Sequence, residues 1–473
     1  MNWTLALPEL VLAVCSMGVL TFGVLRGKDS TLACTMLSLG ALLITIVLVL
    51  ATPFGVAYHG QFVEDSFALF SKVLILAGSA LAMIASLDYN AAQRIDRFEF
   101  PVLVLLATVG MMLMVSAHNL MTLYLGLELQ SLAIYVLAAF ARDELRSAEA
   151  GLKYFVLGAL ASGLLLYGIS FTYGFTGTMD FGRLAQVLID PAHVSAGLVV
   201  GIVFIIAGLG FKIAAVPFHM WTPDVYEGAP TSVTTLMATA PKVAAMALLL
   251  RVLATPFGHL LGEWHLIISI VSVASMLLGS LAAIGQWSIK RLMAYSSIGH
   301  MGYALIGLAV GTVAGYRGVL IYLVTYVFMS AGTFGCILAM RRRGRALEKI
   351  ADLAGLARTD PMMAVGLAIF MFSLAGIPPL AGFFGKLYIF LAAVQAGNWA
   401  LAVIGVLTSV IGAFYYIRVV KVMYFDPAEE AFDPRPAALS FVGVVGGLVT
   451  LFFFLFPGPI VGAAQAAAQV LLG

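Results

Sequence analysis

The sequence predicts an all-α membrane protein with about fourteen transmembrane helices, ten of them forming two inverted five-helix repeats. Three observations lead to this fold class. Of the 473 residues, 62% are hydrophobic and only 10% are charged, whereas soluble domains carry roughly 25% charged residues. The apolar residues fall into segments of about 20, the length that crosses a bilayer. Two segments, residues 195–217 and 361–396, are interrupted by prolines.

The expected spans follow from reading the chain with that length as a ruler. They lie at residues 4–25, 31–51, 66–87, 101–117, 120–141, 149–174, 195–217, 231–253, 264–285, 289–310, 315–340, 361–396, 399–424 and 437–461. The first segment has neither a basic start nor a small-residue cleavage site, so we expect a retained helix rather than a signal peptide. The predicted parts are spans 1–3 (residues 1–100), the first repeat of spans 4–8 (101–255), the second repeat of spans 9–13 (256–430) and span 14 (431–473).

Span 12 is too long for one straight helix, and its proline pair explains why. Pro378 and Pro379 have no backbone N–H, so the carbonyls of Leu374 and Ala375 lose their helical partners. In lipid these carbonyls must be satisfied within the protein. Span 7 has a similar break at Pro217. The two broken spans cross the membrane in opposite directions, which predicts inverted repeats with a site at their interface.

Basic residues in short loops predict the orientation, because cytoplasmic loops carry an excess of lysine and arginine. With the N-terminus outside, most basic loops face inward, and an even number of spans returns the C-terminus to the outside. The inward loops hold Arg26, Lys28, Arg94, Arg97, Arg142, Arg146, Lys290, Arg291, residues 341–349 and Arg358, and the outward loops hold Arg183, Arg251 and Arg317.

Four charged residues lie deep within predicted spans: Glu128 in span 5, Lys212 in span 7, Lys242 in span 8 and Lys386 in span 12. A charge near the bilayer centre costs at least about 2.5–3.5 kcal/mol. A single lysine could snorkel to the interface, or donate to an orphan carbonyl of a neighbouring helix. Four such groups, three of them beside prolines, favour a proton relay. Burial favours a neutral lysine, and a facing carboxylate favours a charged one.

Other titratable residues are secondary relay candidates: His300, His219, Lys153 and Lys290. His300 lies within span 10 beside Tyr295, Ser296 and Ser297, whose hydroxyls could extend a hydrogen-bonded path or hold helices together. Either histidine could instead be a satisfied core residue, and for His219, which follows the break in span 7, this interpretation is favoured. Lys72 and Lys153 lie near span ends and could snorkel.

Several kinds of chemistry have no signature in the sequence. The three cysteines have no CxxC spacing, and no HExxH, GxxxxGK[ST] or GxGxxG motif occurs. A net charge of +2 gives no indication of a nucleic-acid partner. We therefore expect no cofactor and no metal in this chain. The acidic segment at residues 426–436 is expected to be a solvated inner loop without a function of its own.

Four motifs resemble one known family. LELQSLAIYVLAAF, GLGFKIAAVPFHMWTPDVYEGAPT, SIKRLMAYSSIGHMGY and SLAGIPPLAGFFGKLY are similar to the antiporter-like subunits of respiratory complex I, and the resemblance covers nearly the whole chain. The starts LPELVLA and DSFALFSKVLIL resemble the N-type members. Lys386 stands where M-type members usually have glutamate.

The resemblance implies proton translocation that is coupled to quinone reduction in other subunits. It implies that Glu128 pairs with Lys212, that Lys242 is a central relay and that Lys386 serves the exit side. Flavin, iron–sulfur clusters and quinone would lie on other subunits. The partners would be lipids and neighbouring K-type and M-type subunits in a bacterial inner membrane. Two alternatives stay open: a cation/proton antiporter subunit of the Mrp type, and a scaffold that does not pump.

Overall fold

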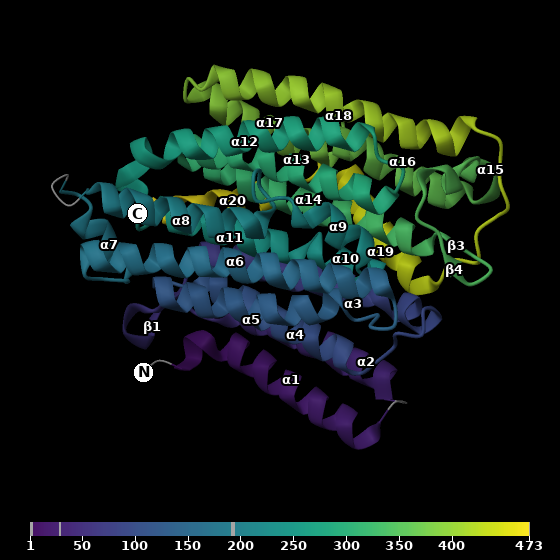
Figure 1. The fold of residues 1–473 in the computed structure, drawn as a ribbon, viewed down its shortest axis with the longest axis horizontal. Helices are drawn as coiled ribbons and strands as arrows, with labels where there is room; N and C mark the ends of the chain where they lie inside the picture. Colours follow the sequence, from purple (N-terminus) through teal and green to yellow (C-terminus); the bar gives the residue numbers. More distant parts are fainter. Residues whose placement is uncertain (1–2, 28–29, 191–193, 473) are drawn as a thin grey trace.

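Long helices that run along a common direction make up almost the whole chain (Figure 1). The computed structural model describes residues 3–27, 30–190 and 194–472, so Lys28, used in the orientation argument, lies outside the described residues. Both chain ends lie at the end of the bundle that also carries strand β1, and strands β3 and β4 lie at the opposite end. The chain therefore crosses the bundle an even number of times, as the sequence predicts.

Within the described ranges, eleven helical segments are long and apolar enough to cross a membrane. They are formed by α1 (Leu7–Arg26), α2 (Thr31–Ala51), α3 (Ser66–Ala92), α4 (Glu99–Ser116), α5 (Leu120–Ala138), α6 (Leu145–Thr176), α8 (Ala196–Ile213), α10 (Thr231–Met237) with α11 (Ala240–Ala254), α12 (Leu261–Ile284), α14 (Val313–Ala339) and α18 (Trp399–Phe425). Shorter apolar helices are α16 (Pro361–Ala375), α17 (Ala381–Gln395) and α19 (Ala437–Phe452), and α13 (Ile289–Ala309) is long but more polar. Each of the fourteen predicted segments thus corresponds to a helix or to a broken pair.

Short elements that the sequence analysis did not predict lie between and beyond these helices. The helices are α7 (Phe181–Val187), α9 (Trp221–Gly228), α15 (Leu356–Thr359) and α20 (Gly458–Val470), with 3₁₀ turns at Trp3–Ala6, Tyr58–Gly60, Gly258–Leu260 and Ile350–Leu353. The strands form two antiparallel hairpins, β1 (Gly55–Ala57) with β2 (Phe62–Glu64), and β3 (Arg341–Arg342) with β4 (Arg345–Ala346). Val56 pairs with Val63 in the first hairpin, and Arg342 pairs with Arg345 in the second.

Three helices are broken where the chain has prolines. The expected span 195–217 ends early, because α8 stops at Ile213 and Ala214 has a left-handed φ of 62°. Helix α16 stops at Ala375, before the proline pair, with Gly376 at a φ of 90°. The predicted span over residues 231–253 is confirmed, but it consists of two separate helices, α10 and α11.

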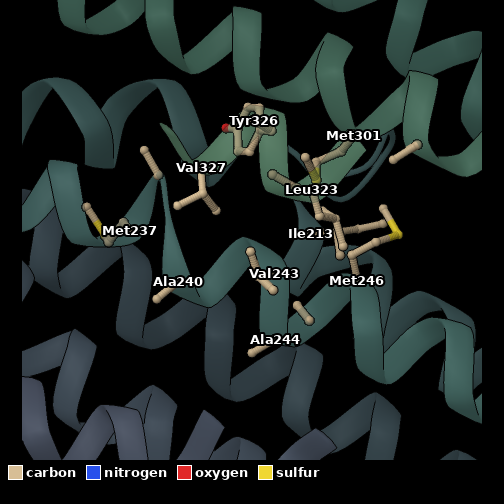
Figure 2. Packing of buried hydrophobic residues seen from close by; sticks show 14 of the residues in the cluster. Ile213, Met237, Ala240, Val243, Ala244, Met246, Met301, Leu323, Tyr326 and Val327 are labelled. Carbon is tan, nitrogen blue, oxygen red and sulfur yellow. The ribbon is translucent and has the colours of Figure 1, made fainter. Parts of the chain in front are cut away.

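The third break follows from Pro241, one residue before Lys242, whose effect the sequence analysis did not predict. Pro241 has no N–H to offer the carbonyl of Met237 four residues earlier. The hydroxyl of Tyr226 donates to that carbonyl instead, at 3.2 Å. Figure 2 shows Met237 and Ala240 on the two sides of the break, with Val327 and Tyr326 near it.

The most deeply buried helices occupy the centre of the bundle. The apolar window of α10–α11 is fully buried and that of α14 is 94% buried, whereas those of α1, α2, α6, α12 and α18 are 39% buried. The outer helices present apolar side chains on their free faces, such as Leu43, Leu160 and Val410. The central helices instead pack against other helices on all sides. Lys242 on α11 therefore lies in the best-shielded part of the chain.

The acidic segment 426–436 is bound to the basic β3–β4 hairpin. Glu429 and Glu430 form ion pairs with Arg342 and Arg343 of the β3–β4 hairpin, at 3.0 and 2.9 Å. Asp433 accepts hydrogen bonds from the backbone N–H groups of residues 343 and 344. These backbone donors lower the pKa of the Asp433 carboxyl. The segment thus fastens the basic hairpin at one end of the bundle, a contact that the sequence analysis did not predict.

Close glycine contacts hold α5, the helix of Glu128, against α4. A Cβ on Gly110 would lie 2.5 Å from the backbone nitrogen of Gln130 and 2.7 Å from the carbonyl oxygen of Gly126. We predict that Gly110→Ala lowers stability by about 1–3 kcal/mol, because the two backbones must move apart. Thermal unfolding in detergent micelles measures the change.

Gly163→Ala on the lipid side of α6 is the matched control, because a Cβ there meets nothing within 4 Å. Alanine is the better helix former, so the control should be as stable as the unmodified protein or slightly more stable. Equal losses in the two variants would contradict the packing argument.

Candidate functional site

Three of the four predicted deep residues are lysines that the structure buries almost completely. Lys212 at the end of α8 is 6% exposed, Lys242 at the start of α11 is 1% exposed and Lys386 in α17 is 5% exposed. Each is adjacent to a helix break. Glu128, in the middle of α5, is partly buried.

Lys386 satisfies the carbonyls that the proline pair orphans. Its ammonium donates to the carbonyl oxygens of Leu374 and Ala375, both at 3.1 Å, and to the hydroxyl of Ser409 at 2.8 Å. Its Nζ also lies 4.8 Å from the centre of the Tyr303 ring. The second half of the broken helix thus supplies the donor that the first half lacks.

Lys242 does the same for the break in α8. Pro217 cannot donate to the carbonyl of Ile213, and the Lys242 ammonium donates to that oxygen at 3.0 Å. Its Nζ lies 5.3 Å from the centre of the Trp221 ring in α9. Here the donor comes from a different helix, α11.

Helix polarity adds to both arrangements. The C-terminal end of a helix carries a partial negative charge, which stabilises a nearby cation. The ammonium groups of Lys242 and Lys386 lie at the C-terminal ends of α8 and α16. The sequence analysis left open whether a deep lysine donates to an orphan carbonyl, and for these two lysines the structure shows that it does.

Lys212 is different, because its ammonium contacts hydroxyl groups. It donates to Ser131 at 2.7 Å and to Tyr135 at 3.1 Å, both on α5. Ser131 and Tyr135 follow Glu128 by three and seven residues, so the three side chains share one face of that helix. No direct ion pair joins Glu128 and Lys212 in the described part of the chain. Their pairing stays a prediction.

His300 lies within a buried group of hydroxyls. Its Nδ1 is 2.5 Å from the hydroxyl of Tyr322 on α14, and its Nε2 is 3.0 Å from the hydroxyl of Tyr416 on α18. Ser296 lies 2.5 Å from the same Tyr416 hydroxyl. The expected serine neighbour therefore takes part in the network, while the tyrosines come from other helices.

The secondary lysines gather in a charged cluster between α6, α9 and α13. Lys153, with 41% of its side chain exposed, binds Glu149 at 2.7 Å and Asp224 at 2.8 Å. Arg291 binds the same Asp224 at 2.7 Å. Lys290 is buried and donates to the carbonyl oxygens of residues 227 and 229 and to Glu348.

A polar pocket of about 210 Å³ opens in this cluster and is lined by Lys153, Asp224 and Glu227. His219 lies apart from it, half buried, and within the described chain its Nδ1 has no hydrogen-bond partner. Sequence reasoning missed Asp224 and the hydroxyls that bind Lys212. The hydroxyls could have been found from the sequence, because Ser131 and Tyr135 follow Glu128 at helical spacing within one apolar span.

The snorkelling interpretation of Lys72 was wrong. The side chain is completely buried and lies between two carboxylates, those of Glu9 and Glu64. Glu9 comes from α1 and Glu64 from the end of β2, so the ammonium finds its acceptors inside the protein. Lys153 is exposed enough to fit the snorkelling interpretation.

Stability should distinguish the lysines that satisfy carbonyls from the one that binds hydroxyls. We predict that Lys242→Met lowers stability by about 1–3 kcal/mol, since it leaves the buried carbonyl of Ile213 without a donor. Lys212→Met should cost less, because Ser131 also donates to the carbonyl of Leu127 and keeps that partner. Thermal unfolding in detergent at one fixed pH measures both. A larger loss for Lys212→Met would contradict the distinction.

Comparison with known families gives a match over most of the bundle. Residues 117–412 match the family model described as NADH:quinone oxidoreductase/Mrp antiporter, TM. This range contains Glu128, Lys212, Lys242 and Lys386. It leaves out the first four long helices, the end of α18, and α19 and α20.

Two curated relatives match from end to end. NADH-quinone oxidoreductase subunit N of Granulibacter bethesdensis is 66% identical over 477 residues, covering 100% of both chains. The protein of the same name from Gluconacetobacter diazotrophicus is 59% identical over 473 residues, again covering 100% of both.

Solved structures agree with these relatives. A chain of respiratory complex I from Thermus thermophilus superposes with a TM-score of 0.84 and 34% identity, covering 97% of this chain and 100% of that one. A chain of the Mrp complex from Dietzia superposes with a TM-score of 0.84 at 24% identity, covering 100% of both. The second likeness concerns the fold alone.

Proposed function

The chain belongs to the family of NADH-quinone oxidoreductase subunit N, and from this premise we propose that it relays protons in the membrane arm of respiratory complex I. Its partners are then the neighbouring membrane subunits, of the K and M types, and the redox chemistry belongs to other subunits. One observation supports the relay above all others. Lys212, Lys242 and Lys386 are each almost completely buried beside a helix break.

The proposed path starts at the charged cluster of Lys153, Asp224 and Lys290. From there a proton reaches Lys212, whose ammonium is held by hydroxyls that can accept or donate. It passes to Lys242 and then to Lys386, with His300 and its tyrosines as the polar groups nearest the second step. Water would have to complete the path between these groups.

Lys242 and Lys386 can serve as carriers while they support the helix breaks. An ammonium has three N–H donors, and the neutral amine that remains after proton loss still has two. Lys386 can therefore release a proton and keep donating to Leu374 and Ala375, at the expense of its bond to Ser409. The geometry of the break survives both states.

Glu128 would control the relay from a distance. When its carboxylate is near, it stabilises the charged form of Lys212. When the carboxylate moves away, this stabilisation is lost. The hydroxyls of Ser131 and Tyr135 hold the ammonium in both cases. A small displacement of α5 by the neighbouring subunit would thus change the proton affinity of Lys212 without a large movement.

The proposed orientation puts the charged cluster and the β3–β4 hairpin on the inner side of a bacterial inner membrane, and both termini outside. Basic loops support it, and so does the position of both chain ends at one end of the bundle. Protons are then taken up at the inner side and released outward.

A scaffold without transport is the second candidate, and it has an observation in its favour. Lys242 and Lys386 satisfy orphan carbonyls, which is sufficient reason to keep both lysines in a protein that moves nothing. Lys212 satisfies no orphan carbonyl, so it is the residue at which the two candidates differ.

Lys212→Met in the complete complex, reconstituted into liposomes, tests the proposal. NADH oxidation by quinone and the number of protons moved per electron are measured together. We expect the rate of NADH oxidation to fall at least tenfold along with pumping, because loss of the deep cation should raise the barrier by at least about 1.4 kcal/mol. Full turnover with unchanged pumping would favour the scaffold.

Lys421→Met is the matched control. This lysine lies on the outer helix α18, with 59% of its side chain exposed, and pairs with Asp426. Its loss should leave both rates unchanged.

A further inference from the structure

A second group of buried charges lies away from the proposed relay, at the end of the bundle that carries both termini. Glu9 is in the first turn of α1, Glu64 ends β2 and Lys72 is in the second turn of α3. They are 3%, 1% and 0% exposed. The Lys72 ammonium lies 2.6 Å from Oε1 of Glu9 and donates to Oε2 of Glu64. One cation therefore serves two carboxylates.

Each carboxylate keeps an oxygen without a partner. Within the described residues, Oε2 of Glu9 and Oε1 of Glu64 are buried and accept no hydrogen bond. Ser116 at the end of α4 donates only to Oε2 of Glu64, at 3.4 Å. Two buried carboxylate oxygens are thus free to carry a proton.

The neighbouring ion pair does not supply the missing positive charge. Arg251, which the sequence analysis placed in an outward loop, lies buried in the last turn of α11. It binds both oxygens of Asp65 at 2.8 and 2.9 Å. With Glu9 and Glu64 ionised as well, three carboxylates face two cations, and one negative charge is left over.

Among the residues that the structure describes, no other element packed around the group offsets this charge. His118, between α4 and α5, has a pKa lowered by burial and by Arg251, so it is neutral at pH 7. Lys242 on α11 donates to the carbonyl of Ile213, and Arg317 on α14 donates to the side chain of Gln465. Asp180 adds a negative charge, and α2, α19 and α20 contain no Asp, Glu, Lys, Arg or His.

A buried charge without a partner is costly, and a carboxylate in this position takes up a proton instead. Burial raises the pKa of the Glu64 carboxyl to about 7, although Lys72 opposes the shift. Glu64 lies close to the surface at this end of the bundle, because it pairs with Gly55 in a hairpin whose Val56 is 58% exposed.

We propose that Glu9, Glu64 and Lys72 form a proton-binding site, separate from the lysine relay, in which one exchangeable proton is shared by the two carboxylates. The proton comes from water at the end of the bundle and forms an O–H bond on one of the unpartnered oxygens. Its loss restores two carboxylates around one ammonium. The site rests on its own contacts and does not require the relay. In the proposed orientation it faces the side of proton release.

Infrared difference spectroscopy of the purified complex tests this site directly. Spectra taken at about pH 6 and about pH 8 bracket the pKa of Glu64. We expect a carboxylic acid carbonyl band, equivalent to one group per complex, that is present at the lower pH and absent at the higher. Glu64→Gln or Glu9→Gln should remove it, since either leaves one carboxylate paired with Lys72.

The matched control is Glu263→Gln, an exposed glutamate on α12, which should keep the band. Lys212→Met should keep it as well, so a failure of the relay and a failure of this site give different results. If Glu64→Gln prevents assembly, Glu9→Gln provides the same test from another helix. A band that persists unchanged in both glutamine variants, or that is missing from the unmodified complex, overturns the proposal.

Discussion

Carbonyl groups that prolines leave without partners, deep in an apolar bundle, are the constraint on which the rest of the structure depends. Lipid offers no donor, so each must be satisfied within the protein. Lys242 serves Ile213, Lys386 serves Leu374 and Ala375, and a tyrosine hydroxyl serves the third break. Two of the three breaks therefore depend on a buried lysine, and each of these two lysines finds acceptors at a break.

This interdependence clarifies the symmetry of the two repeats. In sequence, Lys212 precedes its proline whereas Lys386 follows, which argues against a residue-by-residue correspondence. In the structure, the residue that corresponds to Lys386 is Lys242, because each lysine donates to a carbonyl at the end of a broken helix. Each predicted repeat thus has a helix break whose free carbonyl is bound by a lysine. In the first repeat the lysine comes from a neighbouring helix, and in the second it comes from the broken helix itself. Lys212 is left as the deep lysine bound to hydroxyls.

Much of this was predictable, for reasons that can be traced to particular residues. The segment lengths predicted the helices, and the missing N–H of Pro378 and Pro379 predicted which carbonyls would be orphaned. Sequence could not predict which donor would reach them. Lys242 and Ile213 are 29 positions apart, and only the packing of α11 against α8 brings them together. Lys72 was misread for the same reason, because its acceptors come from a loop and from another helix.

The central claim is that Glu128 acts through Lys212, and a double-mutant cycle tests it most directly. Turnover of the reconstituted complex would be measured with Glu128→Gln, with Lys212→Met and with both changes together. The account predicts that Glu128→Gln slows the complex that has Lys212 and has no further effect once Lys212 is replaced. An equal proportional loss in both backgrounds would mean that the two residues act independently, and would contradict the account.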